Sequence, residues 1–580
     1  MRLLAACASI ALLVLSPSAG CQSPPGIADS GVDEPFLEQA DAIRRFNESK
    51  AYQGTIGSYS WFEGMRDLPV RGYGLVVGLG ENGSRRCPSR IRKRLSAEIR
   101  KKYGLGDARK GLDHISVERM INAPDTAVVF VHGSIRPAAL AGTKFDLTIQ
   151  ALPETETTSL AGGRLYTCDL RYYRQAGAGV VQEGKVIARG QGPVFVNPFA
   201  QRKSSATPVD LRSARIIGGG SNLNPRRVRL VLSTPSYAMA VNVQDKINDR
   251  FGGGARIAVA ESPSYISIKI PSSYQDRELY FLALVRHLYL SRETGFENRR
   301  ALALAAELPD LRAPHDSIGL ALEGLGKSIR PVVRNLYTHT LPHVTFYAAR
   351  TGLRMSDEMA VAVLGTHASD PNSPYQEEAI RTLGEAAGRF RAASALWQVL
   401  NSNLDINTRV LAYESLAGRQ NTLVDSKNIG NNFVMDHIPA SEGRDIIYCK
   451  VAAEQRIAII GTPRCKTPLF YRHTQGLVTL IADAQAQEIT AIRQTASGRV
   501  SPPTTTSLEL TDLIPLLGAK AGTDKLGRVS GLGLNYSQII DVVAGLCENG
   551  TIDAGFKIER PGTIEATGPK RSTGRPGSEL

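Results

Sequence analysis

The stretch from Val70 to Ser84, VRGYGLVVGLGENGS, is a short apolar run interrupted by glycines. These glycines are Gly72, Gly74, Gly78, Gly80 and Gly83. So much glycine in a strand indicates tight bends or close approach of neighbouring backbones, because side chains there would clash. We expect the modules on either side to be organised around this strand.

Three of these glycines, Gly78, Gly80 and Gly83, also spell the G-x-G-x-x-G fingerprint of dinucleotide-binding proteins. A nucleotide site needs a helix that opens at the third glycine, so that its amides meet the pyrophosphate. Here residues 84–88, SRRCP, intervene, and the downstream segments resemble strands more than βαβ units. We therefore predict a structural turn and no cofactor.

A helix is predicted over residues 89–103, because Ile91, Leu95, Ile99 and Tyr103 form one apolar stripe. Its other faces are strongly basic. One interpretation is a solvated face; the other is contact with an anionic wall polymer or an acidic neighbouring subunit. The residues proposed for that contact are Arg92, Lys93 and Lys101.

Strand patterns follow, and together they predict an antiparallel sheet or barrel. A polar link over residues 200–226 then leads into a second unit, whose order of elements is βαββα. The predicted strands of the first unit are Thr126–Gly133, Phe145–Ala151, Arg164–Leu170, Lys185–Gly190 and Pro193–Val196.

Residues 295–420 show helical periodicity with a loose repeat of roughly 32–34 residues, which is typical of stacked helix pairs. His339 and His343 have the spacing of a metal pair, but Pro342 between them argues against one helix carrying both.

The overall prediction is a multidomain α+β protein. Its segments are a signal peptide (1–20), a tether (21–52), a β-rich module (53–205), a βαββα module (206–290), a helical-repeat-like block (291–425), a β-rich C-terminal region (426–560) and a disordered tail (561–580).

The N-terminus has the charged, apolar and small-residue regions of an export signal, and Ser18-Ala19-Gly20-Cys21 is similar to a bacterial lipoprotein cleavage box. Ser18 departs from the usual aliphatic residue, so ordinary cleavage near Gly20 is the alternative. Gln22 favours the outer membrane by analogy with lipoprotein sorting.

Export would exclude nucleic acid as the partner of a chain with 69 basic and 55 acidic residues. Cys449 and Cys465 are the predicted disulfide.

Four ordered blocks resemble the flagellar P-ring protein family over about residues 55–290. They are Gly72–Leu79 (GYGLVVGL), Phe145–Ile149 (FDLTI), Ser159–Leu165 (SLAGGRL) and Ala188–Val194 (ARGQGPV). The resemblance implies a periplasmic ring of identical subunits around the flagellar rod, next to outer-membrane ring proteins and peptidoglycan. It also implies an assembly role for Gly72, Tyr73, Gly74, Gly78, Gly80 and Gly83, at the contact between copies or with the rod.

The function predicted from these features is a structural, non-enzymatic P-ring-like bushing, tethered to the outer membrane through Cys21. The helical block is an insertion or extension that the family usually lacks. An alternative is an outer-membrane-anchored envelope adaptor, unrelated to flagella, whose helical repeats bind a protein. An enzyme acting on wall polymer is a third hypothesis, although no catalytic motif stands out in the sequence.

Overall fold

The computed structural model describes residues 52–103, 116–176, 180–197, 210–417, 423–430, 432–440, 442–473, 477–494, 500–523 and 529–559. The predicted signal peptide, Cys21, nearly all of the tether and the C-terminal tail lie outside these residues. Within them, no helix has both the length and the apolar character needed to cross a bilayer.

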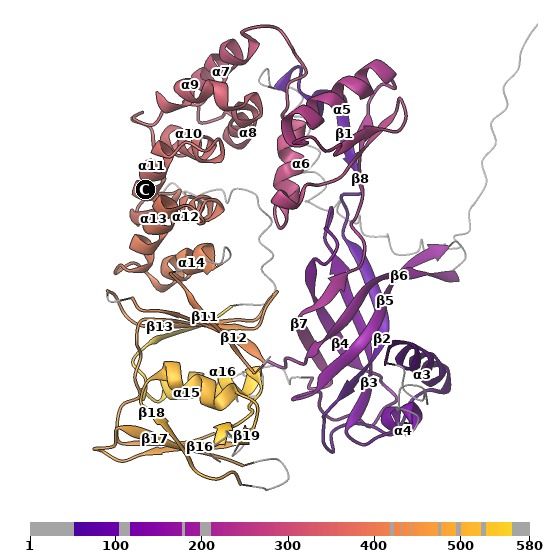
Figure 1. The fold of residues 1–580 in the computed structure, drawn as a ribbon, viewed down its shortest axis with the longest axis vertical. Coiled ribbons are helices and arrows are strands. Elements are labelled where there is room, and N and C mark those ends of the chain that lie inside the picture. Colours follow the sequence, from indigo (N-terminus) through magenta and orange to yellow (C-terminus); the bar gives the residue numbers. More distant parts are fainter. Residues whose placement is uncertain are drawn as a thin grey trace, which may run out of the picture. The chain divides into compact units, whose positions relative to one another are not determined.

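A closed six-stranded barrel forms the first module, as the alternating strand patterns predict (Figure 1). Every pairing between neighbouring strands is antiparallel, in the order β2-β3-β4-β7-β6-β5. The register of the first pair runs from Leu68 opposite Ile135 to Val77 opposite Thr126. The strands are β2 (Leu68–Val77), β3 (Thr126–Ile135), β4 (Lys144–Ala151), β5 (Arg164–Ala176), β6 (Val180–Pro193) and β7 (Ser213–Asn222).

Strand β2 turns its glycines toward the packed interior of the barrel. A Cβ atom at Gly72 would collide with the carbonyl oxygen of Asp169 on β5, and one at Gly74 would lie 2.6 Å from Leu165 Cδ1. The close approach that the sequence predicts is therefore inside one chain. Strand β5 occupies the space that the missing side chains of Gly72 and Gly74 leave, and the role of the motif in contacts between copies stays a prediction.

The turn after β2 contains the three fingerprint glycines. Gly78 and Gly80 have φ values of +80° and +62°, which only glycine adopts readily. Gly83 lies directly against the backbone of Thr126, and the next helix begins only at Ser89. The prediction of a structural turn is confirmed, because no helix N-terminus stands at the third glycine.

Two helices, α3 (Ser89–Tyr103) and α4 (Val117–Ile121), cover the outer face of β2 and β3 (Figure 1). A small separate core holds them there, formed by Leu75 and Val128 of the barrel with Leu95 and Ile99 of α3. The bounds of α3 are those that its apolar stripe predicts.

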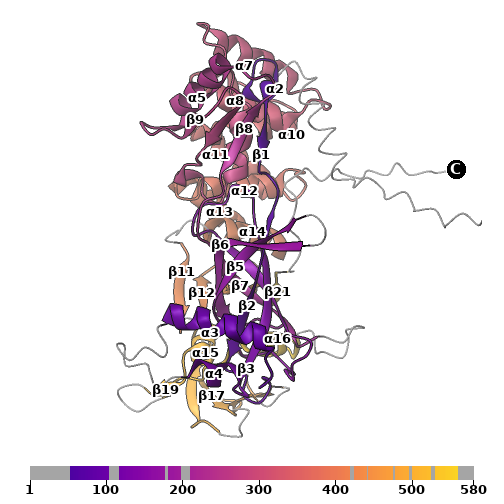
Figure 2. The same ribbon diagram turned by 90° about the vertical axis from the view of Figure 1, so that its right-hand side faces the viewer.

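The second module is a four-stranded sheet with helices on one face. Its strand order is β1-β8-β10-β9, and β1 lies beside β8 (Figures 1 and 2). Ser236 caps the first long helix by accepting a hydrogen bond from Met239 N, as predicted. The elements are α2 (Ile56–Tyr59), β1 (Ser60–Glu63), β8 (Val228–Leu232), α5 (Tyr237–Phe251), β9 (Ala258–Ala260), β10 (Tyr265–Ile268), a 3₁₀ turn (Ser272–Tyr274) and α6 (Glu278–Arg286).

Two segments differ from the expected division. Strand β7 occupies part of the predicted polar link and closes the barrel, whereas β1, from the predicted β-rich module, joins the second sheet. The glycines of β7 suggested a link, but Gly220 is required in the strand because a Cβ there would meet the ring of Phe145.

Helices α7 to α14 form the predicted helical block. Helix α10 packs against α8 and α11, α12 packs against α11 and α14, and α13 packs against α11 and α14. Alternate helices thus stack on one another, as the predicted repeat of helix pairs requires. The helices are α7 (Phe296–Glu307), α8 (His315–Leu325), α9 (Arg330–Arg334), α10 (Pro342–Arg354), α11 (Met359–Ser369), α12 (Gln376–Glu385), α13 (Phe390–Leu400) and α14 (Ile406–Ala417).

The C-terminal region is β-rich, as predicted, and two helices lie between its sheets (Figure 1). These helices, α15 (Leu510–Gly518) and α16 (Tyr536–Glu548), contribute to one continuous core with strands of both larger sheets, which explains their strongly apolar character. The strands are β11 (Asp425–Ile429), β12 (Phe433–Ile438), β13 (Ile446–Lys450), β14 (Arg456–Ile460), β15 (Leu469–Arg472), β16 (Val478–Ala482), β17 (Glu488–Arg493), β18 (Thr504–Ser507), β19 (Gly522–Thr523), β20 (Val529–Gly531) and β21 (Gly555–Ile558).

The predicted disulfide between Cys449 and Cys465 is wrong, since both thiols are free in the structure. Cys449 lies within β13, between β14 and β21, whereas Cys465 forms a separate backbone bridge with Ile552. Burial raises the pKa of Cys465 to about 12 and holds that of Cys449 well above its ordinary value, so both are stable as thiols.

Substitution of Gly72 by alanine tests the interior role of the glycines. We expect Gly72→Ala to lower the free energy of unfolding by roughly 2–3 kcal/mol, because the new methyl group meets a backbone oxygen that cannot rotate away. Urea denaturation followed by circular dichroism measures this loss. Gly388→Ala is the control, since a Cβ there meets nothing within 4 Å. Equal stability of the two variants would contradict the interior role.

Candidate assembly surfaces

The basic side chains of α3 divide into an inward set and an outward set. Arg90, Lys93 and Lys101 are exposed and follow a helical spacing along one side. Among the residues that the structure describes, none of the three takes part in an ion pair. We call these three residues the basic stripe. It is the part of α3 that can meet an anionic partner.

Arg92, which the sequence analysis groups with Lys93 and Lys101, points elsewhere. Its Nη2 donates a hydrogen bond to the carbonyl oxygen of Cys87 at 2.9 Å, so it fixes the entry to α3. At the other end of the helix, Lys102 Nζ lies 2.8 Å from Asp169 Oδ1 on β5. Arg94 lies over the ring of Tyr73, with its Cζ 5.9 Å from the ring centroid. Tyr73 therefore anchors the helix to the barrel.

A partly buried charge network joins the βαββα module to the helical block. Arg277, just before α6, pairs with Glu385 of α12 at 3.2 Å, and Arg354 of α10 pairs with the same carboxylate at 2.6 Å. Tyr280 of α6 donates a hydrogen bond to Glu323 of α8. No spacing pattern in the sequence predicts this network, because its members are far apart along the chain.

The two carboxylates of this network titrate differently. Burial raises the pKa of Glu323 above its ordinary value, and the Arg354 charge offsets this only in part. Burial would also raise the pKa of Glu385, but its ion pairs with Arg354 and Arg277 outweigh burial and leave the pKa below normal. Glu385 is therefore the ionised centre of the network.

The C-terminal region contacts the barrel through Asp146 of β4. This carboxylate accepts hydrogen bonds from Gly218 N at 2.7 Å and from Ala453 N at 3.0 Å. Phe195, just after β6, packs into the C-terminal core with its ring centroid 6.2 Å from that of Tyr536. The segments that follow residue 296 thus contact both earlier modules.

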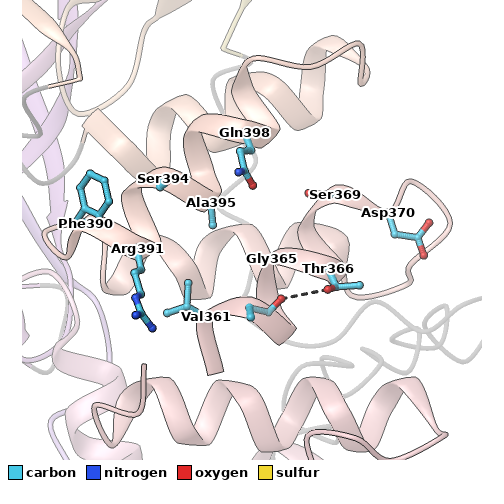
Figure 3. Close-up of a pocket in the computed structure, with 11 residues that line it drawn as sticks. Val361, Gly365, Thr366, Ser369, Asp370, Phe390, Arg391, Ser394, Ala395 and Gln398 are labelled. Atoms are coloured by element: carbon cyan, nitrogen blue, oxygen red, sulfur yellow. Dashed lines mark hydrogen bonds between the residues drawn. The ribbon is translucent and has the colours of Figure 1, made fainter. Parts of the chain in front are cut away.

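A shallow groove of about 580 Å³ lies between α11 and α13 (Figure 3). Small residues such as Gly365 and Ala395 line it, and Phe390 stands at one end with 87% of its surface exposed. Its charged lining residues are Asp370 and Arg391. The other lining residues are small, apolar or uncharged polar side chains.

The histidines considered as a metal pair lie in different surroundings. Pro342 is the first residue of α10, so His339 precedes the helix while His343 is buried inside it. Across the described ranges, no group of three or more potential ligands is placed to hold a metal ion. Nε2 of His343 lies 3.3 Å from the carbonyl oxygen of Pro309, which is a structural contact.

The barrel, the two-layer module and the stacked helices together define a multi-module α+β protein with exposed basic and apolar faces. Comparison with known families is more specific: residues 56–296 match the family described as flagellar P-ring protein. The match covers the stretch in which the four sequence blocks predict a resemblance to that family.

Individual relatives carry the same description. The chain is 28% identical to a flagellar P-ring protein of Geobacter metallireducens over 39% of this chain and 59% of that protein. It is 30% identical to one from Aquifex aeolicus, over 42% and 63% of the two chains. A match to the Geobacter sulfurreducens protein covers 53% and 81% at 26% identity. The chain thus spans about three-fifths of the length of the first two relatives.

Loss of the Glu385 carboxylate should destabilise the helical block. Glu385→Ala leaves Arg354 and Arg277 without their shared partner in a partly buried site, so we expect a loss of about 3 kcal/mol in the free energy of unfolding. Glu377→Ala, on the exposed side of the same helix, should cost less than about 0.5 kcal/mol. Chemical denaturation of the full chain measures both, and similar losses would contradict a central role for Glu385.

Proposed function

We propose that this chain is a structural subunit of a flagellar P-ring-like assembly in the periplasm, acting as a bushing around the flagellar rod. The observation that carries this proposal is the extent of the family match. It begins in α2 and ends at Phe296, the first residue of α7, so it contains the barrel and the βαββα module whole. A homologous region with complete cores can keep the family's assembly surfaces.

The role is non-enzymatic and depends on stiff packing between identical copies. A closed ring needs head-to-tail contacts, in which one surface of each copy meets a different surface of the next. The helical block and the C-terminal region are additions to this plan. Their contacts with both family modules suit a brace that holds the subunit rigid.

The basic stripe of α3 would face an anionic neighbour, for which peptidoglycan is the proposed candidate. Its side chains are exposed and unpaired among the described residues, so their charge is available. Anchoring of α3 through Tyr73 and Asp169 would hold the stripe in a fixed orientation. Contacts of this kind weaken as salt screens them over a Debye length of about 8 Å.

Membrane attachment would come from lipidation of Cys21, which places the subunit at the outer membrane. Partners there would be the outer-membrane ring proteins and, on the inner side of the ring, the rod. This part of the proposal depends on the cleavage box in the sequence. Labelled fatty acid should enter the wild type but not Cys21→Ala, and equal labelling would refute it.

The α11–α13 groove favours a second candidate, an outer-membrane-anchored envelope adaptor that binds a protein through its helices. Phe390 is exposed beside a groove lined by small residues, and an exposed apolar side chain in such a place favours docking of a protein partner. This function would not require rings.

Electron microscopy of the purified full-length protein separates the two candidates. We expect closed rings for the P-ring-like subunit, and deletion of the gene should abolish swimming. Monomers at all concentrations, together with normal swimming of the deletion strain, would contradict the ring and leave the adaptor.

Charge reversal tests the basic stripe. Lys93→Glu with Lys101→Glu should reduce binding to isolated cell wall several-fold at low salt, because two unpaired cations of the stripe change sign. The control is Lys327→Glu with Arg312→Glu, which reverses two exposed charges of the helical block. Unchanged binding of the stripe variant would show that the stripe is merely solvated.

A further inference from the structure

The βαββα module leaves one face of its sheet open. Its helices α5 and α6 pack on the opposite face, where Val228, Leu230, Ile266 and Ile268 are buried. Trp61, Val231 and Tyr265 form a row across three neighbouring strands on the open face, at paired register positions. The Trp61 side chain is 52% exposed. Exposed Trp and Tyr side chains are typical of the centre of a protein interface.

Toward one end, the same face changes from apolar to basic. Val231 and Arg229 point to the open side of β8, and exposed Arg227 continues their alternation just before that strand. Lys269, just after β10, is exposed in the matching position beyond Tyr265 and Ser267. Arg229 also lies 3.9 Å from Glu63, but both side chains are largely exposed, so this pair is weak and leaves the face basic overall.

The outward side of α5 has the complementary pattern. Ala240, Val243 and Ile247 face the sheet and are buried. Tyr237 and Val241 on the outer side are 68% and 45% exposed. Further along the helix, on the same side, the side chains become acidic at Asp245 and Asp249. Lys246 and Arg250 are also on this helix, and Arg250 turns toward α8, where it donates to the carbonyl oxygen of Glu323.

The spacings of the two patterns agree. From Val241 to Asp249 the helix advances about 12 Å, at 1.5 Å per residue. From Val231 to Arg227 the chain of β8 advances about 14 Å, at 3.4 Å per residue. One arrangement therefore brings the apolar residues of both faces together and places the aspartates opposite the arginines.

One copy cannot satisfy both faces itself, because the open sheet face and the outer side of α5 lie on opposite sides of the same two-layer module. Two surfaces that complement each other from opposite sides of one molecule generate head-to-tail contacts, which close into a ring when the rotation per copy permits. We propose that the open sheet face of one copy docks onto the outer side of α5 of the next copy. This inference rests on the proposed ring function and names the surfaces that build the ring.

Charge exchange tests the pairing. Arg227→Glu with Arg229→Glu should reduce ring formation at least tenfold, as should Asp245→Arg with Asp249→Arg. Combining all four substitutions in one chain should restore rings, because the two charge patterns are then exchanged. Lys327→Glu with Arg312→Glu is the control and should form rings normally.

Crosslinking provides a readout that does not depend on charge. A chain that carries both Val231→Cys and Val241→Cys should give a ladder of oxidised oligomers, whereas an equal mixture of the two single variants should stop at dimers. In one outcome, the wild type forms rings while charge exchange fails to rescue them and the double-cysteine chain gives no ladder. That combination would overturn this inference and leave the ring function intact. Absence of wild-type rings would overturn both. If the arginine variant loses cell-wall binding and keeps its rings, the sheet face binds wall polymer instead, and the inference is wrong.

Discussion

Contact between β2 and β5 inside the barrel is the constraint on which the rest of the family region depends. The carbonyl of Asp169 lies where a side chain at Gly72 would be, so the barrel closes only with glycine there. The carboxylate of the same aspartate pairs with Lys102 at the end of α3. One residue thus links closure of the barrel to the position of the helix that carries the basic stripe.

Beyond residue 296, the chain adds modules that return to the family region. The helical block contacts α6 through Arg277 and Glu385, and the C-terminal region contacts β4 through Asp146. Contacts with both family modules tie the added modules to the barrel and to the βαββα module.

Much of this architecture follows from local sequence patterns. Periodicity gave the bounds of α3, the cap of α5 and most barrel strands, because each depends on residues close in the chain. Strand β7 was missed because its glycines resemble a linker until Phe145 is seen packed against Gly220. The thiol state of Cys449 and the Glu385 network depend on non-local contacts, which no spacing in one sequence reveals.

Native-state hydrogen exchange of the full-length protein tests the central claim most directly. If β2 is locked between β3 and β5, the amide of Leu75 should exchange as slowly as that of Val128, its partner in the paired strand β3. Exchange of Leu75 as fast as that of Gly80 in the adjacent turn would contradict the account, because β2 would then not be held inside a closed barrel.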